Sequence, residues 1–212
     1  NDIIVELQEQ FTLVGTITSI NINIAGSSTT GTGIILDDDT LTVIVDDASA
    51  VEGNLITFPV TLSNPISTPI TLTFVLTNGT ASDLDYSTTP VTITIPANTT
   101  TSSFTVSTTN DIIDESDETF NVAITTTYTE PIDITDTAIG TITDDPLDTA
   151  TFNVGDATVL EGNVATVTVT LSNPSSVDTV TNIVSSNGTA TAPIDYTPVT
   201  TQVTIPAGQT SV

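Results

Sequence analysis

Five carboxylates crowd into one short segment, residues 110–120. They are Asp111, Asp114, Glu115, Asp117 and Glu118. Two carboxylates 4 Å apart repel each other by roughly 4 kcal/mol at an effective dielectric of 20. The segment is therefore either an acidic loop kept in water or a site where a bound cation offsets the repulsion.

The same pattern occurs a second time, 109 residues earlier in the chain. Residues 1–11 keep three of the five acidic positions, an isoleucine between them and the first apolar residue of the strand that follows, namely Asp2, Glu6, Glu9, Ile4 and Phe11. The retained acidic residues are spaced like ligands. This repetition favours a binding role over a merely solvated loop.

Composition narrows the class of partner. The 212 residues contain no Lys, Arg, His, Cys, Met or Trp and carry a formal charge of −26. Nucleic acid is excluded as a partner, because phosphate contacts need Lys or Arg, and no apolar run approaches the roughly 20 residues of a membrane-inserted helix. Only oxygen ligands are present, and these favour a hard cation such as Ca²⁺.

Internal repetition extends over the whole chain. Residues 1–39 match 110–146, and residues 147–212 match 40–102. The repeated motifs include Val51-Glu-Gly-Asn54 with Leu160-Glu-Gly-Asn163, and Asn78-Gly-Thr-Ala81 with Asn187-Gly-Thr-Ala190. We predict a tandem array with a period of about 109 residues: 1–39 is the C-terminal part of one repeat, 40–146 is a complete repeat, and 147–212 is the N-terminal part of the next.

Apolar residues alternate with Thr through the complete repeat, and this period of two predicts strands. About seven strands are expected, around residues 41–45, 56–62, 70–76, 91–95, 104–106, 120–124 and 139–143. That number in about 107 residues is typical of an all-β, immunoglobulin-like sandwich. Pro59 suggests that its strand lies at a sheet edge. Asn78-Gly79 predicts a type I′ turn, and Gly31-Thr-Gly33 a hairpin loop.

The acidic residues of the complete repeat fall at strand ends. Glu52 precedes the second predicted strand, Asp85 precedes the strand at 91–95, and Asp144-Asp145 end the last strand. If strands alternate in direction, these positions and the 110–118 loop reach one pole, which also faces the next repeat. Carboxylates gathered there would repel each other unless cations bridge them.

With these motifs in fixed order, the chain resembles tandem Calx-β domains. The matching residues are Val51-Glu-Gly53, Asn78-Gly-Thr-Ala81, Asp85-Tyr86, the 110–120 segment and Asp144-Asp145. The resemblance implies Ca²⁺ ligands at Glu52, Asp85, Asp111, the Ile113 carbonyl, Glu115, Glu118, Asp144 and Asp145. In the first segment it implies Asp2, the Ile4 carbonyl, Glu6, Glu9, Asp37, Asp38 and Asp39, and in the last segment Glu161 and Asp195.

Two departures from the family pattern reduce the number of ions expected. Asn110 replaces an acidic residue, and Pro146 replaces the third terminal Asp. A further pattern, Asp-Thr followed by an apolar residue, resembles an acceptor for O-glycans in some bacteria. It occurs at Thr40, Thr137, Thr149 and Thr179.

Several functions are compatible with these observations. The repetition, the acidity and the missing trypsin-like cleavage sites favour an extracellular, non-catalytic stalk of a bacterial surface adhesin of the gliding type, in which Ca²⁺ stiffens one repeat against the next. The alternatives are a calcium-sensing regulatory module and a self-assembling extracellular fibre. A glycoside hydrolase with paired carboxylates is disfavoured, because the chain has no Trp and only 4% aromatic residues.

Overall fold

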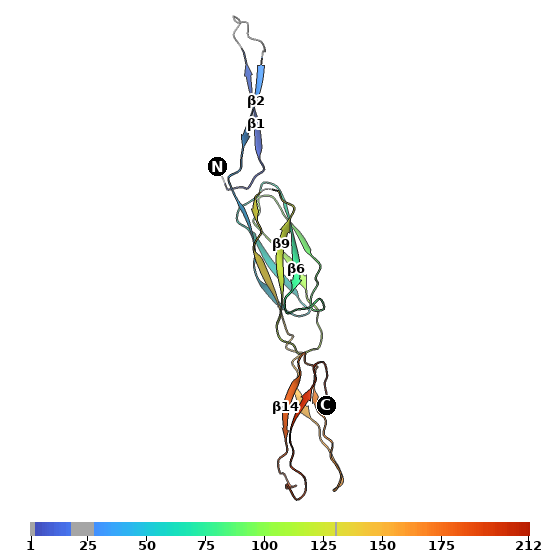
Figure 1. The fold of residues 1–212 in the computed structure, drawn as a ribbon. Helices are drawn as coiled ribbons and strands as arrows, with labels where there is room; N and C mark the ends of the chain where they lie inside the picture. The colour runs from blue at the N-terminus through green and yellow to red at the C-terminus, as the bar shows by residue number, and fades with distance from the viewer. Residues whose placement is uncertain (1–2, 18–27, 130) are drawn as a thin grey trace.

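The structure is a computed structural model that describes residues 3–17, 28–129 and 131–212. Those residues form strands β1 to β15 and no helix, so none of them belongs to a helix that could cross a membrane. The strands lie in three groups along an elongated molecule (Figure 1). The predicted all-β class is confirmed.

The middle group is a sandwich of two sheets. The first sheet has the order β10-β3-β5-β8, with β10 at Ile132–Asp133, β3 at Leu41–Val45, β5 at Leu55–Leu62 and β8 at Thr101–Ser107. The second has the order β4-β11-β9-β6-β7, with β4 at Ala48–Val51, β11 at Thr137–Thr143, β9 at Glu118–Thr126, β6 at Ile70–Asn78 and β7 at Val91–Ile95. All seven predicted strands are present, and the short strands β4 and β10 add to them.

The sandwich core is built from the alternating apolar residues of both sheets. Along β5 the buried positions alternate with exposed ones, as the period of two requires. Phe104 of β8 stacks on Phe58 of β5 and on Phe74 of β6, with ring centroids 4.9 and 4.0 Å apart. Phe120 of β9 meets Phe58 edge to face at 6.0 Å. These rings join the two sheets at the centre of the sandwich.

The prediction that Pro59 marks an edge strand is wrong, because β5 lies between β3 and β8. Pairing with β3 stops at Val60, which faces Val45. The carbonyl of Pro59 accepts a hydrogen bond from the Asp46 amide just beyond this point, at 3.1 Å. Within a strand a residue's N and C=O point to the same side, so the N–H that Pro59 lacks would lie past the end of the ladder.

The two outer groups repeat strand pairs of the sandwich. At one end β1 (Glu9–Thr16) pairs antiparallel with β2 (Ser28–Ile35), as β9 does with β11. At the other end β12 (Phe152–Val154) pairs with β13 (Val169–Leu171), and β14 (Thr179–Val184) pairs with β15 (Thr200–Ile205). A small core of Val169, Leu171 and Ile205 supports this last group.

One cross-strand pair recurs in both the first group and the sandwich. Phe11 faces Gly33 across β1 and β2, and Phe120 faces Gly140 across β9 and β11. A Cβ at Gly140 would lie 2.2 Å from the Phe120 ring, so the ring covers the glycine closely. Gly31-Thr-Gly33 therefore belongs to strand β2, and the predicted hairpin loop there is wrong.

The type I′ turn predicted at Asn78-Gly79 is also wrong. Such a turn needs positive φ at both central residues, and neither has it. The chain instead makes a long loop from β6 to β7, and the Gly79 and Ala81 amides both donate to the carbonyl of Thr119, at 3.1 and 2.9 Å. Asn78 accepts a 2.7 Å hydrogen bond from the hydroxyl of Tyr86, as Asn187 does from Tyr196 at 2.8 Å.

Gly79→Ala is expected to destabilise the sandwich by roughly 1–3 kcal/mol, because overpacking a close contact forces a backbone shift. A Cβ at Gly79 would lie 2.5 Å from the carbonyl oxygen of Thr119. Gly188, one period later, has no atom within 4 Å of its Cβ position and provides the matched control. Urea unfolding of Gly79→Ala and Gly188→Ala tests this prediction, and equal midpoints would contradict it.

Candidate metal centre

Four loops of the sandwich bring carboxylates to one end. Glu52 follows β4, Asp85 lies between β6 and β7, the 110–118 segment joins β8 to β9, and Asp144 follows β11. A single open cavity is lined by six of the predicted ligand residues, together with Ser82, Leu84 and Thr109: Glu52, Asp85, Asp111, Ile113, Glu115 and Glu118. The structure thus places these residues together at one pole.

Three of these carboxylates lie closest to one another. One oxygen each from Asp85, Glu115 and Glu118 falls within 4.8 Å of the others. The closeness of Asp85 is, after burial, the main cause of the raised pKa of Glu118. All three side chains are half-buried, so water only partly screens their repulsion.

Backbone amides hold the acidic loops in shape. The Ile113 amide donates to Asp111 Oδ1 at 2.7 Å, and the Ser82 amide donates to Asp85 Oδ2 at 2.6 Å. The Glu115 amide donates to Asp144 Oδ1 at 3.1 Å, which ties the 110–118 loop to the end of β11. These amide hydrogen bonds fix the positions of Asp111, Asp85 and Asp144.

Glu52 is the most constrained member of the cluster. Its side chain is only 7% exposed, and its Oε1 atom has no hydrogen-bond partner. Burial, followed by the charge of Asp111, raises its pKa from 4.5 to about 7, although the Asp145 amide opposes this shift. An unpaired buried carboxylate is costly, so this oxygen is available to a cation.

Three further carboxyl groups of the pole, those of Glu118, Glu115 and Asp144, have pKa values shifted in the same direction. Burial, then the contact with Asp85, raises the pKa of Glu118 from 4.5 to about 7. Burial, then the charge of Asp111, raises the pKa of Glu115. Burial also raises the pKa of Asp144, against the hydrogen bond from Glu115. The chain has no Lys, Arg or His to relieve this repulsion.

This donor set fits a hard divalent cation. Ca²⁺ takes six to eight oxygen ligands in flexible geometry, and the cavity offers five carboxylates and the backbone at Ile113. Glu52, Asp85, Asp111, Glu115 and Glu118 would hold the ion, with Asp144 next to them through its bond to Glu115. A bound ion would supply the positive charge that the side chains lack.

The acidic loop also contacts the following segment of chain directly. Asp114 forms an isolated parallel bridge with Ser175: its amide donates to the Pro174 carbonyl at 2.9 Å, and its carbonyl accepts from the Ser176 amide at 3.0 Å. Its Oδ2 atom accepts from the Ala150 amide at 3.1 Å. The acidic 110–118 loop is thereby part of the junction.

The same bridge occurs at the other junction, 109 residues earlier. Val5 pairs with Ile66, donates to the Pro65 carbonyl at 2.8 Å and accepts from the Ser67 amide at 3.0 Å. Here the paired side chains are apolar, with Val5 2% and Ile66 0% exposed, and both belong to the sandwich core. Both junctions are therefore fixed by main-chain hydrogen bonds.

The family model of the Calx-beta domain matches this chain twice, at residues 37–156 and 143–212. This chain belongs to the Calx-beta family. The two matches are adjacent and cover the sandwich and the segment that follows it, so the chain carries Calx-beta domains in tandem.

Two solved structures with similarity to this chain come from Calx proteins. The apo-form Calx CBD1 domain is 20% identical, covers 50% of this chain and 97% of its own, and has a TM-score of 0.44. The calcium binding domain CBD12 of CALX1.1 is 16% identical, covers 80% of this chain and 72% of its own, and has a TM-score of 0.43. A search of curated proteins finds no match.

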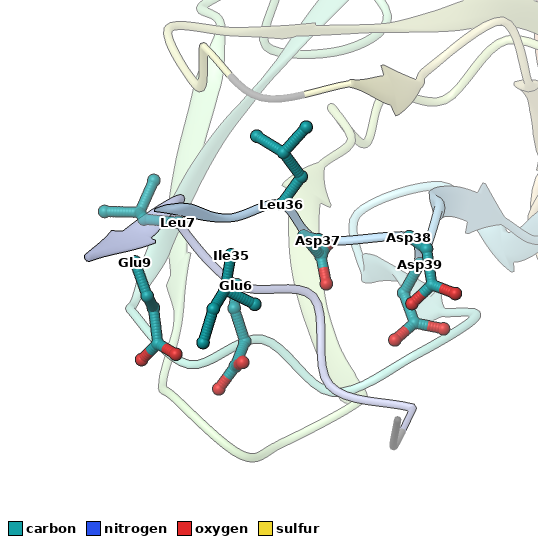
Figure 2. A pocket seen from close by; sticks show the side chains of 8 residues that line it. All are labelled: Glu6, Leu7, Glu9, Ile35, Leu36, Asp37, Asp38 and Asp39. Carbon is teal, nitrogen blue, oxygen red and sulfur yellow. The ribbon is translucent and has the colours of Figure 1, made fainter. Parts of the chain in front are cut away.

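The predicted ligands of the first segment lie near one another on the two arms of the β1–β2 hairpin. Glu6 and Glu9 come from the arm that enters β1, and Asp37, Asp38 and Asp39 follow β2 (Figure 2). These five carboxylates line one cavity. Leu7 and Leu36 line it as well, and their side chains point in the opposite direction from the carboxylates (Figure 2). Ile4 is not among the residues that line this cavity. Asp2 lies outside the described residues.

The two predicted ligands of the last segment are not brought into such a cluster. Glu161 and Asp195 are exposed, and Asp195 Oδ2 accepts hydrogen bonds from the Thr191 amide and hydroxyl, at 2.8 and 3.1 Å. Among the residues that the structure describes, the only three-carboxylate group tight enough to hold an ion is that of Asp85, Glu115 and Glu118.

Sequence reasoning missed two carboxylates at the junction, Asp114 as a contact to the next segment and Asp148. No signal in the sequence marks Asp114 as a contact, because its counterpart one period earlier is the apolar Val5. Of the four threonines predicted to carry glycans, Thr40, Thr137 and Thr149 are exposed and Thr179 is half-buried.

The pKa shifts predict that, without metal, the protein loses stability as pH rises. Glu52 and Glu118 have pKa values of about 7 in the folded protein, against the ordinary glutamate value of 4.5, so the unfolded chain releases these protons first. Between about pH 4.5 and 7 the unfolded chain therefore holds fewer protons, and the free energy of unfolding falls as pH rises.

The melting temperature in chelator should thus be several degrees higher at pH 5.5 than at pH 8. Excess Ca²⁺ should reverse this order, because carboxylates must be deprotonated to bind the ion. Calorimetric scans at the two pH values measure both effects. A melting temperature that rises between pH 5.5 and 8 in chelator would contradict the prediction.

Proposed function

We propose that this Calx-beta chain is a non-catalytic, calcium-stiffened stalk segment of a repetitive bacterial surface adhesin, located outside the cell. The observation that carries the proposal is the buried, unpartnered Oε1 atom of Glu52 within a cluster of carboxylates. Such a cluster is stable at neutral pH only with a cation or with bound protons. One domain type repeated along an elongated chain suits a spacer.

In this proposal, repeats of about 109 residues meet near residues 39–40 and 146–147. Calcium at the acidic pole offsets the repulsion within the 110–118 loop and holds that loop in the shape that places Asp114 on the next repeat. The bridge from Asp114 to Ser175 and the bond to Ala150 then resist bending at the junction. The absence of Lys and Arg removes trypsin-like cleavage sites, which suits an exposed protein.

Small-angle X-ray scattering of the 212-residue chain tests this function. In excess Ca²⁺ the scattering should give a larger maximum dimension and a narrower distribution of conformations than in chelator. Mg²⁺ at the same ionic strength is the control, because it favours stricter octahedral geometry. Profiles that are identical with Ca²⁺ and with chelator would rule out calcium stiffening.

A second candidate, self-assembly into a fibre, is favoured by the apolar residues that the β1–β2 hairpin exposes. Phe11 is 48% and Leu13 62% exposed, whereas Phe120, one period after Phe11, is 0% exposed. In the sandwich β9 is covered by pairing with β6. Pairing of β1 with β14 of a second copy would cover the hairpin in the same way. Light scattering decides this: a mass that grows with concentration supports assembly, and a constant monomer mass excludes it.

A further inference from the structure

The segment after β11 departs from its counterpart after β2 by two additional residues. Asp144-Asp-Pro-Leu-Asp148 stands where Asp37-Asp-Asp39 stands one period earlier. The match resumes immediately afterwards, since Thr149-Ala-Thr151 corresponds to Thr40-Leu-Thr42. Pro146 and Leu147 are thus the two additional residues, and Asp148 is the next carboxylate along the chain.

The hydrogen bonds made just after Asp148 show that it corresponds to Asp39. The Ser172 amide donates to the Thr151 carbonyl, and the Thr151 amide donates to Ser172 Oγ, both at 2.9 Å. Ser63 and Thr42 exchange the same two hydrogen bonds, both at 2.9 Å. Asp148 therefore immediately precedes its repeat in the same way as Asp39, one of the predicted ligands.

Asp148 is buried in a way that is unusual for a carboxylate. Its side chain is 7% exposed, and its Oδ2 atom has no hydrogen-bond partner. Among buried side-chain nitrogen and oxygen atoms in the described residues, only this atom and Glu52 Oε1 lack a partner. Both unpartnered atoms are carboxylate oxygens, and they lie at the same junction.

The rest of Asp148 is anchored on both sides of the junction. Its amide donates to the Asp145 carbonyl at 2.8 Å, which closes a turn after β11. Asn173 Nδ2 of the following segment donates to the Asp148 carbonyl at 3.2 Å and lies 3.5 Å from Oδ1. The carboxylate is held by these contacts while Oδ2 stays unpaired.

Asp148 also lies beside the acidic pole, because the Glu52 amide donates to the Thr143 carbonyl at 2.9 Å and the Asp148 amide donates to the carbonyl of Asp145, two residues further on. Its charge contributes to the raised pKa of Glu52 and to that of Asp144, behind burial in both cases. No cationic side chain exists in the protein to balance the three groups. A buried carboxylate in such a position needs either a proton or a cation.

We propose that Asp148 is an additional calcium ligand at this junction, that it takes the position that Asp39 holds one period earlier, and that Asn173 couples it to the following repeat. This inference rests on the proposed calcium binding at Glu52, Glu115 and Glu118. It places the ion between two repeats, so that binding involves atoms from both sides of the junction.

Calcium titration of the whole chain by calorimetry tests the proposal. Asp148→Asn should remove one binding step or weaken it about tenfold or more, because ligand charge sets calcium affinity. Asp156→Asn, an exposed carboxylate of the following repeat, is the matched control and should leave the isotherm unchanged. Asn173→Ala should weaken the same step without altering the others.

Thermal unfolding gives a readout that a purely structural Asp148 would not produce. In chelator, Asp148→Asn should melt higher than wild type, because it removes an unpaired buried charge; in Ca²⁺ it should melt lower. If Asp148→Asn leaves the calcium isotherm unchanged while Glu115→Gln abolishes binding, the inference fails and the proposed function stands. If the wild-type chain binds no calcium, both fail. A shift of equal size and sign in both conditions would overturn the inference as well.

Discussion

Replacing Glu115 and Glu118 together by Gln is expected to remove most of the stabilisation that calcium gives this chain. One oxygen each from these side chains and from Asp85 lies within 4.8 Å of the others, so the double variant loses two of three carboxylates at the tightest point. A site with calcium at 100 times its dissociation constant adds about 2.7 kcal/mol to stability, and the variant should forfeit this.

The same variant should be more stable than wild type in chelator. Glutamine keeps the shape of glutamate but removes a buried charge, and burial together with the neighbouring carboxylates raises the pKa of both groups. Asp117→Asn is the control, because Asp117 lies in the same loop with an exposed side chain. Melting temperatures of the three proteins, each with calcium and with chelator, measure both effects. A double variant that calcium stabilises as strongly as wild type would show that the ion binds elsewhere.

Phe120→Ala is expected to destabilise the sandwich by about 3–5 kcal/mol, the range for removing a large buried aromatic side chain. Phe120 is 0% exposed, stacks on Tyr86 with ring centroids 4.2 Å apart, and covers Gly140. Natural domains are stable by only about 5–15 kcal/mol, so this loss would remove a large part of the stability.

Phe11→Ala provides the matched control, since Phe11 occupies the same position one period earlier and faces Gly33. Its ring is 48% exposed in this chain, and we expect a loss below about 1 kcal/mol. Urea unfolding followed by circular dichroism measures both variants. Equal losses would indicate that the hairpin is covered in solution, as the fibre candidate requires.

The strands could be predicted because each of them repeats the period of two over several residues. Leu41–Val45 and Leu55–Leu62 bury every second side chain, as their sequences indicate. The exceptions are the two shortest strands of the sandwich. β4 and β10 contain too few residues to show a period, and they exist because β11 and β3 offer them an edge in parallel.

The errors arose where a local signal was overridden by tertiary contact. Asn78-Gly79 is typical of a tight turn, but the glycine is needed because the carbonyl of Thr119 lies where a Cβ would be. A proline within a strand is typical of a sheet edge. Here the pairing of β3 with β5 ends at Val60, so no residue of β3 needs the amide hydrogen that Pro59 lacks. A sequence window does not contain the distant strand in either case.

The acidic pole could be predicted in outline, because loops at the same ends of alternating strands must meet. Glu52, Asp85 and the 110–118 loop do lie around one cavity. The part that Asp148 plays could not be predicted from the sequence. The insertion of Pro146 and Leu147 hides its correspondence to Asp39, and the burial of its side chain depends on contacts with the next repeat.

The measurement that tests the central claim most directly is the melting temperature of the 212-residue chain in excess Ca²⁺ and in chelator. We predict a rise of several degrees with Ca²⁺, given about 2.7 kcal/mol for a site at 100 times its dissociation constant, and a much smaller rise with Mg²⁺. An unchanged melting temperature would contradict calcium stiffening and leave an acidic sandwich held together by its apolar core alone.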